Sequence, residues 1–302
     1  KQVEILDGII TQDDLSNEKL EDWFGATEIF NVSESVSIED SNISKRSFFS
    51  IDSVLSVNIQ CNVETIGFSA FKECKSLVSV EIPSLKYLSD QCFSGCRKLE
   101  FVDFPNLKIV GAYSFYMCIN LKKVDFPYLE SVMYGGFSFC LNLESVNLKS
   151  ISDLKGGSFY RCSNLKSIDL PNIRCVYDEA FSQCISLRSC YFSNAQFVGH
   201  TCFSGCRRLV DVSLPNVVNI SNYGFMDCTN LKDISFSILE SIGIKSFYSC
   251  MSLVNINLPH LDVMNDNAFE YCISLTNISF PNVVKVMDYC FQNCALLKCI
   301  NL

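Results

Sequence analysis

Histidine, tryptophan and positive charge are all scarce in this chain of 302 residues, which contains two histidines and one tryptophan. So few imidazole groups leave little scope for metal binding or acid–base chemistry, since histidine is the commonest metal ligand and titrates near neutral pH. Lys and Arg total 24 against 33 Asp and Glu, a net charge of −9. Nucleic acid binding requires a basic surface, so no nucleic acid partner is expected. The apolar runs fall short of the roughly 18 residues of a membrane-spanning helix, so no membrane insertion is expected either.

Motifs for nucleotide, phosphate or metal chemistry are missing as well. The chain has no G-x-G-x-x-G, G-x-x-x-x-G-K-[ST], H-E-x-x-H or G-x-S-x-G segment. It has no C-x-x-C pair, and its histidines, His200 and His260, lie 60 residues apart, whereas zinc sites bring such ligands together. We therefore expect no enzymatic activity, no cofactor and no metal site.

What the chain does contain is a repeat. Phenylalanine recurs with a first step of 23 residues and then every 22 residues, without insertion or deletion. From Phe71 onward, Cys follows each Phe after three residues and Leu after six, and all seven prolines lie twelve residues after a Phe. The Phe series is Phe48, Phe71, Phe93, Phe115, Phe137, Phe159, Phe181, Phe203, Phe225, Phe247, Phe269 and Phe291. The Cys ladder is Cys74, Cys96, Cys118, Cys140, Cys162, Cys184, Cys206, Cys228, Cys250, Cys272 and Cys294.

The full repeat reads F-x-x-C-x-x-L-x-x-V-x-[LF]-P-x-L-x-x-[VI] and predicts one coil of a solenoid. The alternation in L-x-x-V-x-[LF] is typical of a short strand with one buried face. Proline ends that strand because it lacks a backbone donor. A single coil cannot bury its apolar residues, but stacked coils form a continuous core. We therefore predict a right-handed parallel β-solenoid with short strands, some curvature and an irregular convex side over residues 48–302, in about eleven to twelve coils.

This pattern resembles the leucine-rich repeats of the BspA type in its Phe-x-x-Cys turn, its L-x-x-[VI]-x-L-Pro strand and its apolar return segment. It departs from the commoner motif L-x-x-L-x-L-x-x-N-x-L, because Leu107 or Val217 stands where that motif has a buried Asn. No Asn ladder is expected at that position. The resemblance implies a cell-surface protein used in adhesion, and it implies no enzymatic activity.

The two ends differ from the repeat. Residues 1–47 are expected to form an N-terminal cap, with a short helix over residues 16–24 and a degenerate first coil. The apolar residues of that coil are Val32, Val36, Ile38 and Ile43. At the other end, Leu302 is expected to be the last inward residue of an uncovered strand, an edge on which a second copy could stack head to tail.

The Cys ladder is interpreted as a row of small buried side chains, since free cysteine is among the most buried residue types. Disulfide pairing within the ladder is disfavoured, because eleven is an odd number and stacked, in-register cysteines do not readily adopt the disulfide twist.

Binding candidates lie on the strand face, formed by the residues eight and ten positions after each Phe, which point away from the core. Ten positions after the Phe, four of the first five residues are acidic. Phe101 and Tyr191 are the aromatic exceptions on this face. The acidic row could be a docking strip for a basic partner or a cation, or could be a solvated row neutralised by Lys122, Lys123 and Lys166. The candidates for partner binding are Glu81, Phe101, Asp103, Asp125, Asp169 and Tyr191.

The function predicted from these features is a non-enzymatic binding scaffold that presents its strand face to a protein or glycan, at the cell surface or outside the cell. Two alternatives remain open. One is a structural subunit that stacks end to end into a filament. The other is a cytoplasmic interaction scaffold, which many unpaired thiols would suit.

Overall fold

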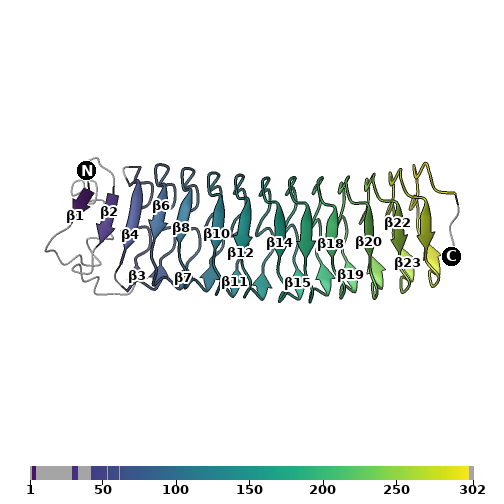
Figure 1. The fold of residues 1–302 in the computed structure, drawn as a ribbon, viewed down its shortest axis with the longest axis horizontal. Coiled ribbons are helices and arrows are strands. Elements are labelled where there is room, and N and C mark those ends of the chain that lie inside the picture. Colours follow the sequence, from purple (N-terminus) through teal and green to yellow (C-terminus); the bar gives the residue numbers. More distant parts are fainter. Residues whose placement is uncertain (1, 5–28, 33–41, 53, 61, 299–302) are drawn as a thin grey trace. The chain divides into compact units, whose positions relative to one another are not determined.

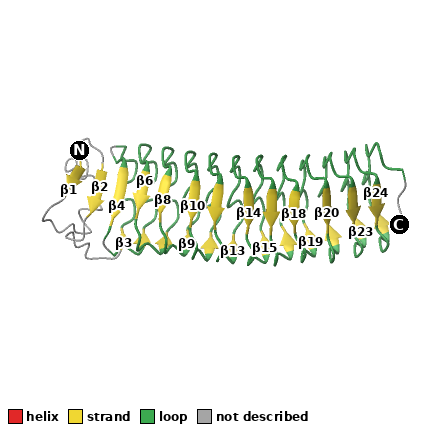
Figure 2. Cartoon of the chain, viewed as in Figure 1, coloured by secondary structure: helices red, strands yellow, loops and turns green. Residues whose placement is uncertain are grey.

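The computed structural model describes residues 2–4, 29–32, 42–52, 54–60 and 62–298, and forms two compact units, unit 1 (residues 1–150) and unit 2 (residues 151–302). In each unit the chain winds in stacked coils whose strands run parallel (Figure 1). No helix occurs in the described residues (Figure 2). The described residues therefore contain no helix that is long and apolar enough to cross a bilayer.

Unit 1 has two series of parallel strands. The first series contains the longer strands, and the second contains two-residue strands. The longer strands are β1 (Gln2–Glu4), β2 (Ile29–Val32), β4 (Ser56–Ile59), β6 (Ser79–Glu81), β8 (Phe101–Asp103), β10 (Lys123–Asp125) and β12 (Ser145–Asn147). The two-residue strands are β3 (Asn42–Ile43), β5 (Thr65–Ile66), β7 (Tyr87–Leu88), β9 (Ile109–Val110) and β11 (Ser131–Val132). Register follows the repeat, so Val80 pairs with Val102 in the next coil.

Unit 2 repeats this arrangement. Its three-residue strands are β14 (Ser167–Asp169), β16 (Ser189–Tyr191), β18 (Asp211–Ser213), β20 (Asp233–Ser235), β22 (Asn255–Asn257) and β24 (Asn277–Ser279). Its two-residue strands are β13 (Asp153–Leu154), β15 (Cys175–Val176), β17 (Phe197–Val198), β19 (Asn219–Ile220), β21 (Ser241–Ile242), β23 (Val263–Met264) and β25 (Lys285–Val286). The fold class predicted from the repeat, a parallel β-solenoid, is confirmed.

The core is built from the Phe, Cys and Leu positions of the repeat. Phe159 and Cys162, for example, are fully buried. Rings of successive coils stack almost parallel, with centroids from 4.7 Å apart for Phe48 and Phe71 to 5.7 Å apart for Phe269 and Phe291. The predicted burial is thus confirmed from Phe48 to Phe269, while Phe291 in the last described coil is half-buried.

The turn around each Phe forms a further backbone ladder between coils. The residues two before and two after the Phe have positive φ, as in Glu179 (57°) and Gln183 (61°) around Phe181. This alternation points the amide N–H groups of Glu179, Phe181 and Gln183 toward the next coil, where they donate to backbone carbonyls at 2.7–2.9 Å. The segment that the repeat predicts to be irregular is therefore tied coil to coil by regular hydrogen bonds.

The cysteines of the ladder form hydrogen bonds between coils in addition to filling space in the core. Within each unit the ladder thiols donate to the carbonyl of the Phe in the preceding coil, as in Cys118 to Phe93 at 3.1 Å and Cys184 to Phe159 at 3.1 Å. That carbonyl also accepts the amide N–H of the Cys in its own coil. The interpretation of the ladder as small apolar side chains was therefore incomplete, because the position needs a compact side chain that can also donate. The described cysteines are all free thiols.

Thiol reagents should distinguish buried from accessible cysteines. Burial raises the pKa of Cys184 from 9.0 to about 12, which leaves almost no reactive thiolate at neutral pH. We expect the ladder thiols to resist an aromatic disulfide reagent in the folded protein, and all 18 cysteines to react in urea. Half-buried Cys175 and Cys294 are the exceptions and should react early, so Cys175→Ser should reduce that phase. Rapid native labelling of Cys184 would contradict this account.

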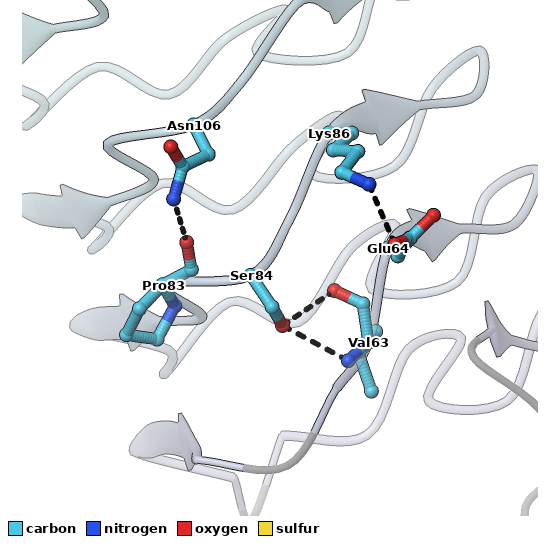
Figure 3. Close-up of polar contacts among 6 residues, drawn as sticks. All are labelled: Val63, Glu64, Pro83, Ser84, Lys86 and Asn106. Atoms are coloured by element: carbon cyan, nitrogen blue, oxygen red, sulfur yellow. Dashed lines mark hydrogen bonds and ion pairs between the residues drawn. The ribbon is translucent and has the colours of Figure 1, made fainter.

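Side chains between coils also hold the loop that follows each longer strand (Figure 3). Asn106 Nδ2 donates to the carbonyl of Pro83 at 2.8 Å, and Ser84 Oγ donates to the carbonyl of Val63 at 2.8 Å. Leu107, the next residue, is fully buried, as the departure from the commoner leucine-rich motif predicts. Asn ladder bonds thus occur one position earlier, on the exposed side of the loop.

The predicted helix over residues 16–24 lies outside the described residues, as do Val36, Ile38 and Leu302. Of the expected first coil, Ile43 is buried in β3, which pairs with β5, and β2 pairs with β4. The division into a cap over residues 1–47 and a solenoid over residues 48–302 stays a prediction.

Candidate binding surfaces

Three of the predicted acidic candidates lie on the strand face of unit 1. Strands β8 and β10 expose their first and third residues and bury the middle one, so Asp103 and Asp125 point to solvent. Glu81 is partly exposed and pairs in register with Asp103. The repeat thus places carboxylates of consecutive coils in one row.

The row is only partly neutralised. Asp125 accepts from Asn147 Nδ2 at 2.7 Å and has Lys123 Nζ at 3.8 Å. Asn58 Nδ2 donates to Glu81 at 3.4 Å. The Asp103 carboxylate, by contrast, has no hydrogen-bond or ion-pair partner within the described part of the chain, which makes it the most available anion of the row.

Lys122, expected to neutralise the row, instead forms an ion pair with Glu100 at 2.9 Å. Both residues stand one position before the first strand-face residue of their coils, so this pair runs beside the row. The sequence interpretation was therefore right for Lys123 and wrong for Lys122. Lys122 reaches Glu100 because the two residues hold the same repeat position in adjacent coils, one position outside the strand face.

Phe101 stands beside the acidic row and is 50% exposed. It is the first residue of β8, two residues before Asp103, and therefore shares its face. An exposed aromatic ring next to an unpaired carboxylate combines a hydrophobic anchor with a charge, as binding hot spots often do.

The remaining two candidates lie in unit 2, where Asp169 pairs in register with Tyr191. Asp169 is exposed, and the Tyr191 side chain is 37% exposed. The Tyr191 hydroxyl donates to the Asp211 carboxylate, and this hydrogen bond raises the pKa of Tyr191. Because its hydroxyl is engaged, Tyr191 offers mainly its ring face to a partner.

A group of aromatic side chains on the Phe turns was missed from the sequence. In unit 1, Tyr113 and Tyr116 meet edge to face with centroids 6.0 Å apart, and Tyr116 meets Phe139 at 5.5 Å. In unit 2, Tyr248 meets Tyr271 at 5.5 Å and Lys245 Nζ lies 5.1 Å from the Tyr248 ring centroid. The available signal was the recurrence of Tyr and Phe within two residues of the ladder Phe.

A solenoid of short parallel strands, with a buried Phe–Cys–Leu core and no described helix, defines the class of leucine-rich-repeat scaffolds. The chain belongs to the BspA-type leucine-rich repeat family, whose family model matches it in six copies over residues 41–151, 86–209 and 196–302. Members of this class serve broadly as protein-binding scaffolds, and the solenoid is compatible with that use. No match was found among curated proteins.

Several of the similar solved structures are described as leucine-rich repeat proteins. A leucine-rich repeat protein from Bacteroides ovatus is 24% identical, with 82% of this chain and 86% of that chain covered and a TM-score of 0.41. A leucine rich cell surface protein from Faecalibacterium prausnitzii is 21% identical, with 83% and 86% covered and a TM-score of 0.43. The pneumococcal vaccine antigen PcpA is 16% identical, with 86% and 72% covered and a TM-score of 0.50.

Proposed function

We propose that the strand face of unit 1 binds a basic segment of a partner protein, and that the chain acts as a non-enzymatic adhesion scaffold at the cell surface or outside the cell. The observation that carries the proposal is the row of Glu81, Asp103 and Asp125 with exposed Phe101 beside it. Family membership and the description of one similar structure as a cell surface protein support the location.

Charge favours a protein over a glycan as the partner on this face. Carboxylates of adjacent coils repel one another, and a lysine or arginine side chain that reaches several of them relieves this repulsion, whereas a neutral sugar does not. The chain's net charge of −9 adds a field that attracts a basic partner. A filament subunit and a cytoplasmic scaffold remain alternatives, and light scattering of the purified protein separates the filament from the binding scaffold.

The test uses a lysine-rich fluorescent peptide as the probe, with a glutamate-rich peptide of equal length as the control ligand. Neutralising the row by Glu81→Gln, Asp103→Asn and Asp125→Asn together should weaken binding about tenfold, because three exposed charge contacts are worth about 0.5 kcal/mol each. Added salt should weaken wild-type binding in the same direction.

A charge-matched control separates this site from the overall field. Asp52→Asn, Glu64→Gln and Glu130→Gln remove the same charge from unit 1 without touching the row, and should leave peptide affinity within about twofold. Equal losses in the two triple variants would show that net charge, and not the strand face, attracts the peptide.

Phe101→Ala tests the hydrophobic anchor separately. The side chain is 50% exposed, so the free energy of unfolding should change by less than about 1 kcal/mol. Binding of a lysine-rich peptide that carries one central Trp should weaken several-fold in Phe101→Ala, as measured by fluorescence anisotropy, whereas binding of the all-lysine peptide should change little. An equal effect on both peptides would remove Phe101 from the binding surface.

A further inference from the structure

A polar hollow of about 570 Å³ lies in unit 2 over strands β17, β19 and β21, away from the strand face. Its volume falls in the range of small-molecule sites. The polar side chains that line it come from five successive coils. They are Asp178, His200, Asn219, Asn222, Ser241 and Asn265.

Small residues open the hollow. Gly199 and Gly243 occupy the repeat position that holds Tyr177, one coil before Gly199 and three coils before Gly243. A Cβ at Gly199 would lie 2.6 Å from Asp178 Oδ1, and a Cβ at Gly243 would lie 2.4 Å from Asn222 Oδ1. At these two positions the missing Cβ therefore leaves space beside Asp178 and Asn222, both of which line the hollow.

Three of these polar side chains are fixed by a hydrogen bond at one of their two terminal polar atoms. Asp178 Oδ1 accepts the His200 amide N–H at 2.7 Å, and Asn222 Oδ1 accepts the Ile244 amide N–H at 2.9 Å. Asn219 Nδ2 donates to Ser241 Oγ at 2.6 Å. These bonds fix the side chains without help from a ligand.

The second polar atom of each of these three side chains is available to a ligand. Asp178 Oδ2, Asn222 Nδ2 and Asn219 Oδ1 have no hydrogen-bond partner among the residues that the structure describes. The hollow therefore presents oriented acceptors and donors side by side, already ordered by the protein. A ligand that uses them loses little freedom of the protein side chains on binding.

Aromatic surface completes the lining. Half-buried Phe197 forms part of the hollow, and the His200 ring meets Tyr223 edge to face with centroids 5.4 Å apart. Flat rings next to fixed amides and carboxylates suit a molecule with apolar C–H faces and many hydroxyl groups.

We propose that this hollow binds a short neutral saccharide. Sugar hydroxyls donate and accept at once, which matches the alternating free atoms of Asp178, Asn222 and Asn219. Asp178 disfavours sulfated or carboxylated sugars by charge repulsion. The polar lining disfavours an apolar ligand, and no group of metal-ligating side chains occurs in the described part of the chain. The proposal concerns unit 2 alone and is independent of the strand face of unit 1.

The experiment titrates lactose, maltose and cellobiose into the full chain and follows binding by calorimetry and amide chemical shifts, with a sulfated disaccharide as the anionic control. At least one neutral disaccharide should bind saturably at millimolar concentration, with shifts centred on His200 and Asn222. Asp178→Asn replaces the free acceptor by a donor, and Asn222→Asp replaces the free donor by an acceptor. Each should weaken binding about tenfold, because one hydrogen bond becomes a mismatch of like groups.

Both substitutions preserve the bond that holds the side chain, since the chain itself uses Asp and Asn at this repeat position. Asp266→Asn is the matched control, because Asp266 Oδ1 accepts the Asp288 amide N–H at 3.1 Å at the equivalent position outside the hollow. It should leave affinity unchanged. Absence of saturable binding by all three sugars, tighter binding of the sulfated sugar, or equal effects of Asp178→Asn and Asp266→Asn would overturn the proposal.

Discussion

The free energy of unfolding is expected to fall steeply as the pH rises above 9. Burial raises the pKa of the ladder thiols, to about 12 for Cys184 from 9.0 and well above 9.0 for Cys118 and Cys228. The folded protein keeps these thiols protonated, while the unfolded chain releases their protons near pH 9. Their stabilising contribution is therefore complete below about pH 9 and is lost as the pH rises toward the folded-state pKa.

Several thiols act together, which makes the effect large. The contribution of each buried thiol to the free energy of unfolding falls by about 1.4 kcal/mol per pH unit once the thiol is deprotonated in the unfolded chain. Five such thiols together lower the free energy of unfolding by about 7 kcal/mol per pH unit. A protein of ordinary stability, about 5–15 kcal/mol, should unfold within about two pH units above 9. The measurement is the urea unfolding midpoint from neutral to alkaline pH, followed together with the ultraviolet absorbance of thiolate.

Cys184→Ala supplies the control, because it removes one titrating thiol from the row. Its stability at neutral pH should fall, but its loss of stability per pH unit above 9 should be smaller than that of the wild type by one thiol's share, about 1.4 kcal/mol. The thiolate absorbance of the buried ladder cysteines should appear only as the chain unfolds, whereas Cys175 is accessible in the folded protein. Thiolate formation at the ladder cysteines in a protein that is still folded would mean that water reaches the ladder.

Alanine in place of Phe181 is expected to cost about 3–5 kcal/mol of unfolding free energy. The Phe181 ring is fully buried and lies between Phe159 and Phe203, with both centroids 5.5 Å away, and it also packs on Phe192 at 5.6 Å. Removing it leaves a cavity within a continuous stack. The surrounding rings cannot collapse into that cavity, because their coils are fixed by backbone ladders on both sides.

Urea unfolding of Phe181→Ala and of Ile185→Ala provides the comparison. Ile185 stands four residues later in the same coil and is 43% exposed, so its truncation should cost less than about 1 kcal/mol. Similar losses in the two variants would mean that the Phe stack does not dominate the stability of unit 2.

Much of the fold could be predicted because the repeat has one constant length. A shift of 22 residues brings each position onto its own equivalent in the next coil, so Phe181 must stack on Phe203 and Val80 must pair with Val102. Asp103 and Asp125 lie on an exposed face for the same reason, because both stand ten residues after a ladder Phe. Their role in binding remains a proposal, because exposure and charge do not identify a partner.

Other features depend on the direction of a single side chain, which a repeat length does not specify. Lys122 turns to Glu100 and not to the acidic row, and the Cys184 thiol turns to the Phe159 carbonyl. The sequence shows Asp178, His200 and Asn222 as unremarkable polar residues at the end of a coil. Only in three dimensions do they surround one hollow.

The sequence by itself determined which residues are buried, which are stacked and which face solvent, because burial in a solenoid follows from position within the repeat. The tertiary structure alone decided which polar atoms are occupied and which are free. Asp178 and Asn222 each use one atom to hold the next coil and leave the other open, and Gly199 and Gly243 leave space beside the atom that is held. Such a choice is made by contacts between coils, and neighbouring residues in the sequence do not encode it.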